Sequence, residues 1–357
     1  VDWFINSDMR NIIMVLVWGL AFLVFLLAIY CLWLRLLFNL REKKKQKLFS
    51  QWEEAVFKFL EEKQSPREIV KSIPKSDYGY FLNYLEDYLL ILKGEDFERI
   101  SSLITCTELF TYLCERLKYG KSHDRSDAAF FLGLARASEA KTVLKEGLKD
   151  RDESVFFNCA LALAKIGAVE MVGEILRQYY YRKKYSPDLL LSLFFEFGSK
   201  VCPYLLQCLP DKKNESLLTL IVDLLGHFRY YSAGESILKL LKTTSHKELK
   251  MHCIKAIGRM EYIDALPVLR ECLDSPDWVI RSQSIIALGA IGDVTVEKKL
   301  IENLEHEKWW VRYRAAEAIF NLSEQGKEVL KNVVAHSENK KAVTAAQIVL
   351  TEKEVVA

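Results

Sequence analysis

The sequence predicts an all-α chain in which a single N-terminal transmembrane helix is followed by a helical adaptor and a solenoid of helical pairs. Two observations carry this prediction. An uncharged apolar segment of membrane-spanning length occupies residues 12–34. From residue 132 onward, a pair of small or apolar residues, often including Gly, closes an apolar helical stripe about every 31 residues. A constant period of this size is typical of stacked helical repeats.

The apolar segment predicts a membrane anchor. Residues 12–34 (IIMVLVWGLAFLVFLLAIYCLWL) contain no charged side chain. As a helix they span roughly 35 Å, enough to cross a hydrocarbon core of about 30 Å. A secretory signal peptide is the alternative, but it needs a basic start, a shorter apolar run and a small-residue cleavage site. Because Cys31-Leu32-Trp33 is no such site, we expect an uncleaved transmembrane helix over 12–38.

The charges on either side of this segment predict its orientation. Arg10 alone precedes it, whereas a basic flank follows it, made of Arg35, Arg41, Lys43, Lys44 and Lys45. Because Lys and Arg are retained in the cytoplasm, we expect residues 1–11 to lie outside and the rest of the chain to be cytoplasmic. The chain is then a single-pass protein of the inner or plasma membrane. The basic flank is also expected to attract anionic lipid.

Residues 39–122 predict an all-helical adaptor. Apolar residues at helical spacing, among them Trp52, Val56 and Phe59, continue a charged helix beyond the anchor. Further apolar and aromatic segments predict helices over 78–92 and 97–117. Because none of these segments follows the 31-residue period, the repeat array is expected to occupy residues 123–357.

Within the array, each unit predicts a helix A, a short turn and a helix B. Helix B closes at residues 132, 163, 194, 225, 257, 288 and 319. The clearest unit has helix A over 265–273, a turn at 274–277 and helix B from 278. Glycines such as Gly258 and Gly292 are expected where helix B ends or packs closely on the next unit. Residues 342–350 predict a capping helix.

Two of these helices carry a family resemblance. Residues 279–293 (VIRSQSIIALGAIGD) and 310–319 (WVRYRAAEAI) are similar to the second helix of HEAT repeats, closest to the short phycobilisome-lyase-type repeats. The resemblance covers residues 124–351 and is strongest over 250–323. It implies a right-handed, armadillo-like α-solenoid whose concave surface binds proteins. It also implies an alternative function, a lyase-type enzyme or a chromophore-handling protein.

Composition argues against several other classes of protein. Lys plus Arg number 50 against 48 Asp plus Glu, whereas nucleic-acid binders usually carry a basic surface. Neither a Walker-type phosphate loop nor a GxGxxG motif occurs, and no His or Cys set has zinc spacing. The scattered cysteines suit a reducing compartment. We therefore expect no catalytic residues, no cofactor, no metal and no nucleic acid.

One group of residues predicts a partner-binding surface at the starts of successive B helices: Trp278, Trp309, Trp310, Arg312 and Arg314. Trp and Arg are enriched among the residues that dominate binding energies. Because Trp278 and Trp309 are one period apart, they are expected to stack as neighbours. Two alternatives stay open: the tryptophans could fill the core between repeats, and arginines 281 and 312 could pair with acidic residues in nearby turns.

A second candidate patch is Tyr179, Tyr180, Tyr181, Arg182 and Lys183. This stretch predicts a polar aromatic loop that could meet a partner, and its alternative is an extended helix end. Taken together, the sequence predicts a membrane-anchored, non-enzymatic scaffold or accessory subunit. Because anchoring confines encounters to the bilayer plane, we expect the partner to be an integral membrane protein, such as a glycosyltransferase or a transporter.

Overall fold

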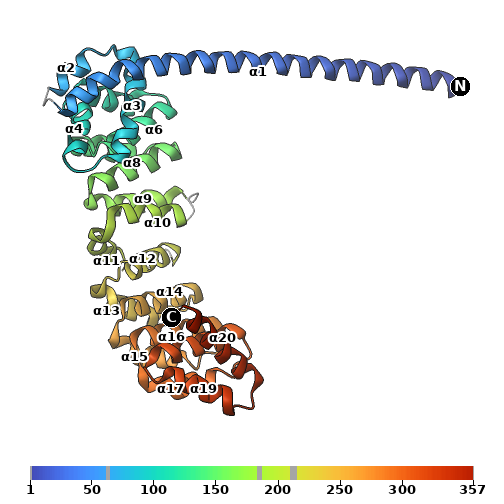
Figure 1. The fold of residues 1–357 in the computed structure, drawn as a ribbon, viewed down its shortest axis with the longest axis vertical. Coiled ribbons are helices and arrows are strands. Elements are labelled where there is room, and N and C mark those ends of the chain that lie inside the picture. The colour runs from blue at the N-terminus through green and yellow to red at the C-terminus, as the bar shows by residue number, and fades with distance from the viewer. Residues whose placement is uncertain (1, 62–64, 183–186, 210–214, 357) are drawn as a thin grey trace. The chain divides into compact units, whose positions relative to one another are not determined.

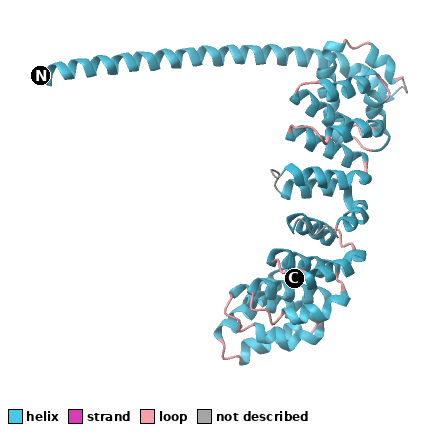
Figure 2. Cartoon of the chain, turned by 180° about the vertical axis from the view of Figure 1, so that it is seen from behind, coloured by secondary structure: helices cyan, strands magenta, loops and turns pink. Residues whose placement is uncertain are grey.

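The computed structural model describes residues 2–61, 65–182, 187–209 and 215–356, which form helices joined by turns (Figures 1 and 2). No strand occurs in these four ranges, so the predicted all-α class is confirmed. The chain divides into two compact units. Unit 1 is Val1–Gly120 with Leu134–Ala137, and unit 2 is Lys121–Gly133 with Ser138–Ala357.

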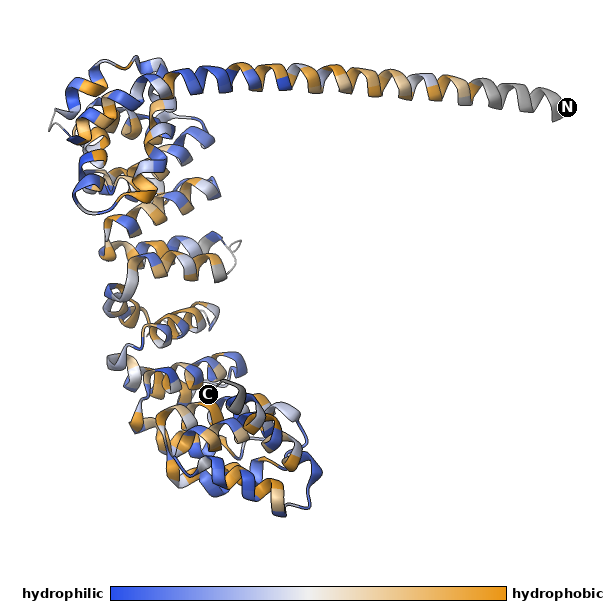
Figure 3. Ribbon diagram, in the orientation of Figure 1, coloured by the Kyte–Doolittle hydropathy of each residue, from blue (hydrophilic) through white to orange (hydrophobic). Residues whose placement is uncertain are grey.

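Unit 1 is built on one long helix, α1 (Asp2–Glu61), which is 60 residues long and unbroken. Its C-terminal part packs on the short helices of the unit: Val56 and Phe59 are 1% and 2% exposed, and the Trp52 ring lies 5.2 Å from Phe81. The other elements are α2 (Pro66–Lys71), η1 (Lys75–Asp77), α3 (Tyr78–Ile91), α4 (Gly94–Thr105) and α5 (Glu108–Tyr119). Figure 3 shows α1 changing from apolar along its middle to polar before the packed end.

The end of α1 is held by an arginine from α4. The last carbonyls of a helix lack partners within the helix. Here the Arg99 guanidinium donates to the carbonyl oxygens of Phe59 and Leu60 and lies 5.4 Å from the centroid of the Phe59 ring. This contact fixes where α1 stops and ties it to the body of unit 1.

The helix predicted over 97–117 is two helices, α4 and α5, separated by a turn at Cys106 and Thr107. The Thr107 hydroxyl donates to the Leu103 carbonyl at 2.7 Å and accepts from the Leu109 amide at 3.2 Å. It therefore caps the start of α5, as threonine often does. The apolar spacing continues across the turn, which is why periodicity alone did not separate the two helices.

Unit 2 is a stack of helical pairs that follow one another in chain order (Figure 1). The B helices are α6 (Ser122–Leu134), α8 (Glu153–Ile166), α10 (Pro187–Phe197), α12 (Glu215–His227), α14 (Lys247–Met260), α16 (Trp278–Ile291) and α18 (Trp309–Leu322). The A helices are α7 (Lys141–Gly147), α9 (Val172–Arg182), α11 (Cys202–Cys208), α13 (Gly234–Thr243), α15 (Leu266–Cys272), α17 (Glu297–Asn303) and α19 (Gly326–His336), and α20 (Lys340–Val356) follows. Every predicted closing position lies in a B helix.

Short 3-10 turns precede six of the A helices. They are η2 (Ser138–Ala140), η3 (Val169–Met171), η4 (Gly198–Val201), η5 (Tyr231–Ala233), η6 (Ile263–Ala265) and η7 (Val294–Val296). Each one leads the chain from the C-terminal end of a B helix into the next A helix. These turns therefore lie at the opposite end of the B helices from Trp278 and Trp309.

Glycines let consecutive B helices touch. A Cβ atom added to Gly133 would lie 2.5 Å from the Ala162 Cα, and one added to Gly258 would lie 2.8 Å from the Ala287 Cα. Gly226 meets Ala256 in the same way, at 2.7 Å. Such contacts exclude any larger residue without a shift of the backbone. The repeated glycine therefore marks a close helix–helix contact between units.

Two segments are long and apolar enough to cross a membrane by length and composition, Met14–Glu61 and Leu189–Cys208. The second contains a helix break at Gly198, whose φ is +67°. Its residues Leu193, Phe194 and Leu205 are fully buried within unit 2, so it supplies repeat core. In the first, none of the most apolar window is buried. The second segment therefore buries apolar side chains within unit 2, whereas the protein leaves the most apolar window of the first segment uncovered.

Candidate partner-binding surface

Three tryptophans lie at the starts of two consecutive B helices. Asp277 caps α16 by accepting from the Val279 amide at 2.9 Å, which places Trp278 at the first helical position. Trp309 and Trp310 are the first two residues of α18, whose N-cap residue, Lys308, makes no side-chain capping hydrogen bond. Their exposed fractions are 37% for Trp278, 40% for Trp309 and 50% for Trp310. The tryptophans are therefore substantially exposed and do not fill the core between repeats.

We call Trp278, Trp309, Trp310, Tyr313 and Arg314 the aromatic surface. The Trp309 ring stacks on Tyr313, with centroids 5.1 Å apart and planes 17° apart, and meets Trp310 edge to face at 4.7 Å. The Arg314 guanidinium lies 5.8 Å from the centroid of Trp310. At this distance a cation is attracted to the face of an indole ring. The surface on α18 is thus a packed aromatic cluster with a cation beside it.

Trp278 and Trp309 begin consecutive B helices, α16 and α18, which pack against each other, but the two rings do not stack. Trp309 turns toward Tyr313, one helical turn along its own helix, and Trp278 makes no ring contact with it in the ranges that the structure describes. Trp278 instead faces Trp310 across a groove. The groove is lined by Val279, Ser282, Gln283 and Ile286 of α16 together with Trp278, Trp310 and Arg314. An apolar groove with a few polar groups is the usual form of a binding site.

Arg281 and Arg312 occupy the same position of successive units. Each one donates hydrogen bonds to the turn that precedes its B helix. Arg281 donates from Nε and Nη2 to the Ser275 carbonyl at 3.1 and 2.9 Å. Arg312 donates from Nη1 to the carbonyls of His306 and Glu307 at 2.7 and 2.8 Å. Their acceptors are backbone carbonyls, not the acidic side chains of the alternative. Arg312, predicted to bind a partner, is thus engaged within its own turn.

The C-terminal helix α20 borders the aromatic surface. The Tyr313 hydroxyl donates to Oε2 of Glu352 at 2.8 Å, and this hydrogen bond, together with burial, raises the pKa of Tyr313. Nη1 of Arg314 lies 2.6 Å from Oε2 of Glu317. Sequence reasoning missed Glu352, because the repeat resemblance ends at residue 351.

The second candidate patch is not a loop where it is described. Tyr179, Tyr180 and Arg182 form the last turn of α9, which agrees with the alternative of an extended helix end. Arg182 donates to the carbonyls of Leu148, at 3.0 Å, and Asp150, and its guanidinium lies 4.4 Å from the Phe156 ring centroid. It therefore holds the preceding turn. Lys183 and the side chain of Tyr181 lie outside the described residues.

The basic flank divides into two faces of α1. Arg35, Arg41 and Lys43 are exposed. Lys44 instead forms an ion pair with Asp77 at 2.8 Å, and Lys45 lies 5.2 Å from the Phe49 ring centroid. Lys44 therefore contributes to the packing of unit 1 as well as to the positive charge of the flank.

Two of the buried cysteines, Cys159 and Cys253, offer little reactive chemistry. Burial raises the pKa of Cys159 and Cys253 to about 12, so both thiols are neutral and poor nucleophiles at physiological pH. Within the described ranges, no group of three or more His, Cys, Asp or Glu side chains could hold a metal ion. The arrangement on α16 and α18 instead suits contact with another macromolecule.

Comparison with known proteins agrees with this architecture. Residues 202–288 and 272–351 match the model of HEAT repeats. The chain resembles solved structures of Kap121p: for Kap121p bound to RanGTP, the TM-score is 0.51 at 14% identity, covering 84% of this chain and 38% of that one. For Kap121p bound to Ste12p, the TM-score is 0.50 at 14% identity, with 78% and 37% covered. No curated protein matches the chain.

The chain spans about two fifths of the length of these solved structures. At this level of identity, the likeness concerns the fold. The family match bears out the predicted HEAT-like repeats over residues 202–351, and the helical pairs continue N-terminal to this range.

Proposed function

We propose that this chain, whose residues 202–351 match the model of HEAT repeats, is a membrane-anchored scaffold without catalytic activity of its own, which binds a protein partner through the aromatic surface. In this proposal residues 1–11 are extracytoplasmic, 12–38 cross the membrane, 39–122 form the adaptor and 123–357 form a right-handed repeat array in the cytoplasm. HEAT solenoids mostly present surfaces to other proteins.

The observation that carries the binding role is the exposure of three neighbouring tryptophans, of which Trp278 and Trp310 line one groove. A tryptophan side chain buries roughly 150–250 Å² when covered. Leaving between 37% and 50% of each uncovered exposes apolar area that a partner can bury. Tryptophan and arginine dominate the energetics of many interfaces. Gln283 and Arg314 add polar groups that can fix the orientation of the bound segment.

The membrane role rests on the exposed apolar part of α1. Side chains such as Trp18, 72% exposed, and Leu23, 54% exposed, have no packing partner of their own in unit 1. A hydrocarbon core would cover all of them at once. The basic flank on the C-terminal side supports a cytoplasmic location for both units.

The partner class follows from this anchor. Two proteins held in one membrane meet at an effective concentration far above that of the same pair in solution. The shared membrane therefore strengthens binding most for an integral membrane protein, for example a glycosyltransferase or a transporter.

Replacing Trp309 and Trp310 by alanine is expected to weaken partner binding at least about tenfold, because each is a large exposed anchor of the kind that contributes about 2 kcal/mol or more. The measurement is the amount of each protein that co-purifies with the full chain from detergent-solubilised membranes. Helix content, followed by circular dichroism, is expected to stay unchanged.

The matched control is the pair Ile263→Ala and Val294→Ala. These side chains are 59% and 58% exposed and begin η6 and η7, at the opposite end of the B helices. The control should retain the partner. Unfolding of the Trp309→Ala/Trp310→Ala variant, or equal loss in the control, would contradict the binding role of the aromatic surface.

A further inference from the structure

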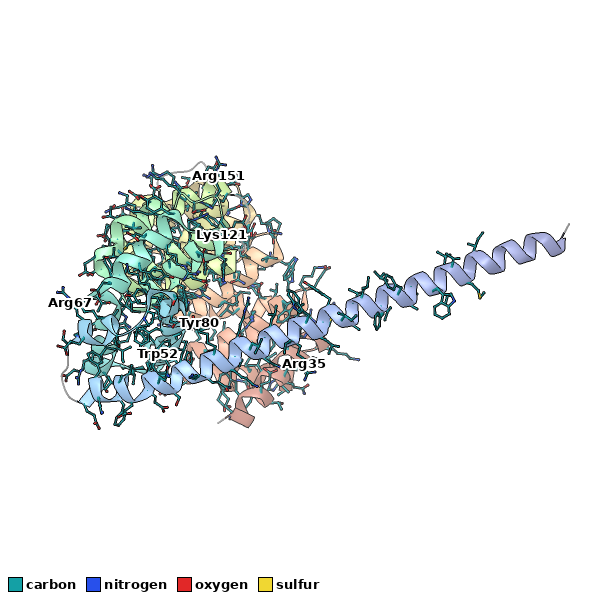
Figure 4. The ribbon with its side chains drawn as sticks, turned by 90° about the horizontal axis from the view of Figure 1, so that it is seen from above. Arg35, Trp52, Arg67, Tyr80, Lys121 and Arg151 are labelled. Atoms are coloured by element: carbon teal, nitrogen blue, oxygen red, sulfur yellow. The ribbon has the colours of Figure 1, made fainter. Side chains whose placement is uncertain are left out.

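Helix α1 is continuous from its apolar part into unit 1. Among the described side chains, the contact with the rest of unit 1 that lies nearest the apolar part is made by Lys44. Its Nζ lies 2.8 Å from Oδ1 of Asp77 and 5.0 Å from the Tyr80 ring centroid. Figure 4 shows Tyr80 on the Arg35 side of Trp52. Asp77 belongs to η1 and Tyr80 to the first turn of α3, so the ion pair and the ring contact of Lys44 join α1 to this corner of the unit.

The helical rise fixes how far this corner stands from the membrane. Leu34 ends the uncharged segment, and Lys44 is ten residues farther along the same helix. At 1.5 Å per residue the separation is about 15 Å. The headgroup layer on each side of the hydrocarbon core is roughly 5–8 Å thick. A helix that leaves the bilayer along its normal therefore places the corner within about 10 Å of the headgroups, and a tilted helix brings it closer.

The charge of this corner suits an anionic surface. Its carboxylate, Asp77, is only 13% exposed and is neutralised by Lys44. Lys71 at the end of α2 and Lys75 in η1 are exposed. Lys43 and Lys47 of α1 are exposed as well. At physiological salt, electrostatic interactions persist over about 8 Å, which is comparable with the separation above.

We propose that the η1 corner, defined as Lys44, Lys71, Lys75 and Tyr80, lies against the anionic headgroups of the inner leaflet. The inference rests on the membrane anchoring proposed above. It adds that unit 1 is held at the lipid surface by a rigid helix instead of hanging from a flexible linker.

The test uses the full chain in nanodiscs that contain phosphatidylglycerol and a lipid with a gadolinium chelate on its headgroup. Cys31, Cys106, Cys114 and Cys208 are replaced by serine, because the other four cysteines are buried. Single spin labels are placed at Ser76 in η1, at Phe57 and at Leu23. Relaxation by the chelate is expected to be at least about tenfold stronger at Ser76 than at Phe57, which lies about 20 Å beyond Lys44 along α1.

A charge variant tests recognition of the anionic lipid. Lys75→Glu is expected to lower the relaxation at Ser76 at least about twofold. Lys58→Glu is the matched control, because it reverses a charge on α1 about 20 Å beyond Lys44 and should change nothing. An unchanged signal in Lys75→Glu would overturn the anionic recognition.

The Leu23 label separates this inference from the anchoring proposal. Equal relaxation at Ser76 and Phe57, with the Leu23 label accessible to oxygen in the hydrocarbon core, would overturn the placement of the corner alone. A Leu23 label that reports water would overturn the anchoring and this inference together.

Discussion

Replacing Leu23 and Leu26 by arginine is expected to move the protein from the membrane to the soluble fraction. Both leucines lie in the middle of the exposed apolar part of α1, 54% and 46% exposed. On insertion scales each apolar residue there contributes about 0.3–0.6 kcal/mol, whereas a central arginine costs about 2.5–3.5 kcal/mol. Two arginines therefore cancel most of the favourable insertion energy. Fractionation after a carbonate wash measures the result.

The matched control places the same change elsewhere in unit 1. Leu90 and Ile91, at the end of α3, are 58% and 75% exposed. A Leu90→Arg/Ile91→Arg variant should stay with the membrane, because it alters no residue of the apolar part. If both double variants remained in the membrane fraction, attachment would have to come from another surface, and the anchor would be disproved.

Gly258→Leu is expected to lower the free energy of unfolding by roughly 3 kcal/mol. A Cβ atom at Gly258 meets both the Cα and the Cβ of Ala287 at 2.8 Å, so the added side chain must push α14 away from α16. Overpacking of this kind costs about 1–3 kcal/mol and sometimes more. Urea unfolding of the full chain in detergent micelles, followed by circular dichroism, measures the change.

Gly173→Leu is the control for this substitution. Gly173 lies in the first turn of α9, where nothing lies within 4 Å of an added Cβ. Leucine is the better helix former by about 0.5–1 kcal/mol, so this variant should be as stable as the parent or slightly more stable. Equal stability of the two variants would show that the B helices do not touch at Gly258.

The periodic features of the fold were predictable because each repeat must bury its helices against its neighbours. In α6, α12, α14 and α16 the small residue that closes the apolar stripe is the one that meets the next B helix, as Gly258 meets Ala287. A contact that recurs in several units leaves a periodic signal in the sequence. The same holds for the arginine of helix B, whose repeated acceptor is a turn carbonyl.

Features that depend on side-chain direction were not predictable from spacing. A period of 31 residues places Trp278 and Trp309 at equivalent positions, but it does not say that Trp309 turns onto Tyr313. The break between α4 and α5 depends on one threonine cap inside an unbroken apolar pattern. The terminal helix α20 places Glu352 beside the aromatic surface, although this residue lies just beyond the end of the sequence resemblance at residue 351.

Locating the binding surface therefore required both the sequence and the structure. The sequence selected the tryptophans because they start successive B helices and are of a residue type enriched in interfaces. The structure places Trp278 and Trp310 on one groove. Arg312 and Arg182 were selected for the same chemical reasons, yet both donate to backbone carbonyls. Composition does not distinguish an arginine that binds a partner from one that holds a turn.

Site-specific photo-crosslinking in intact membranes tests the central claim most directly. A benzophenone amino acid is placed at Gln283, which lines the groove, and in a second variant at Val294, 58% exposed at the other end of the B helices. The account predicts a discrete adduct with an integral membrane protein from Gln283, lost in the Trp309→Ala/Trp310→Ala background, and no such adduct from Val294. The same adduct from both positions, or none from Gln283, would contradict it.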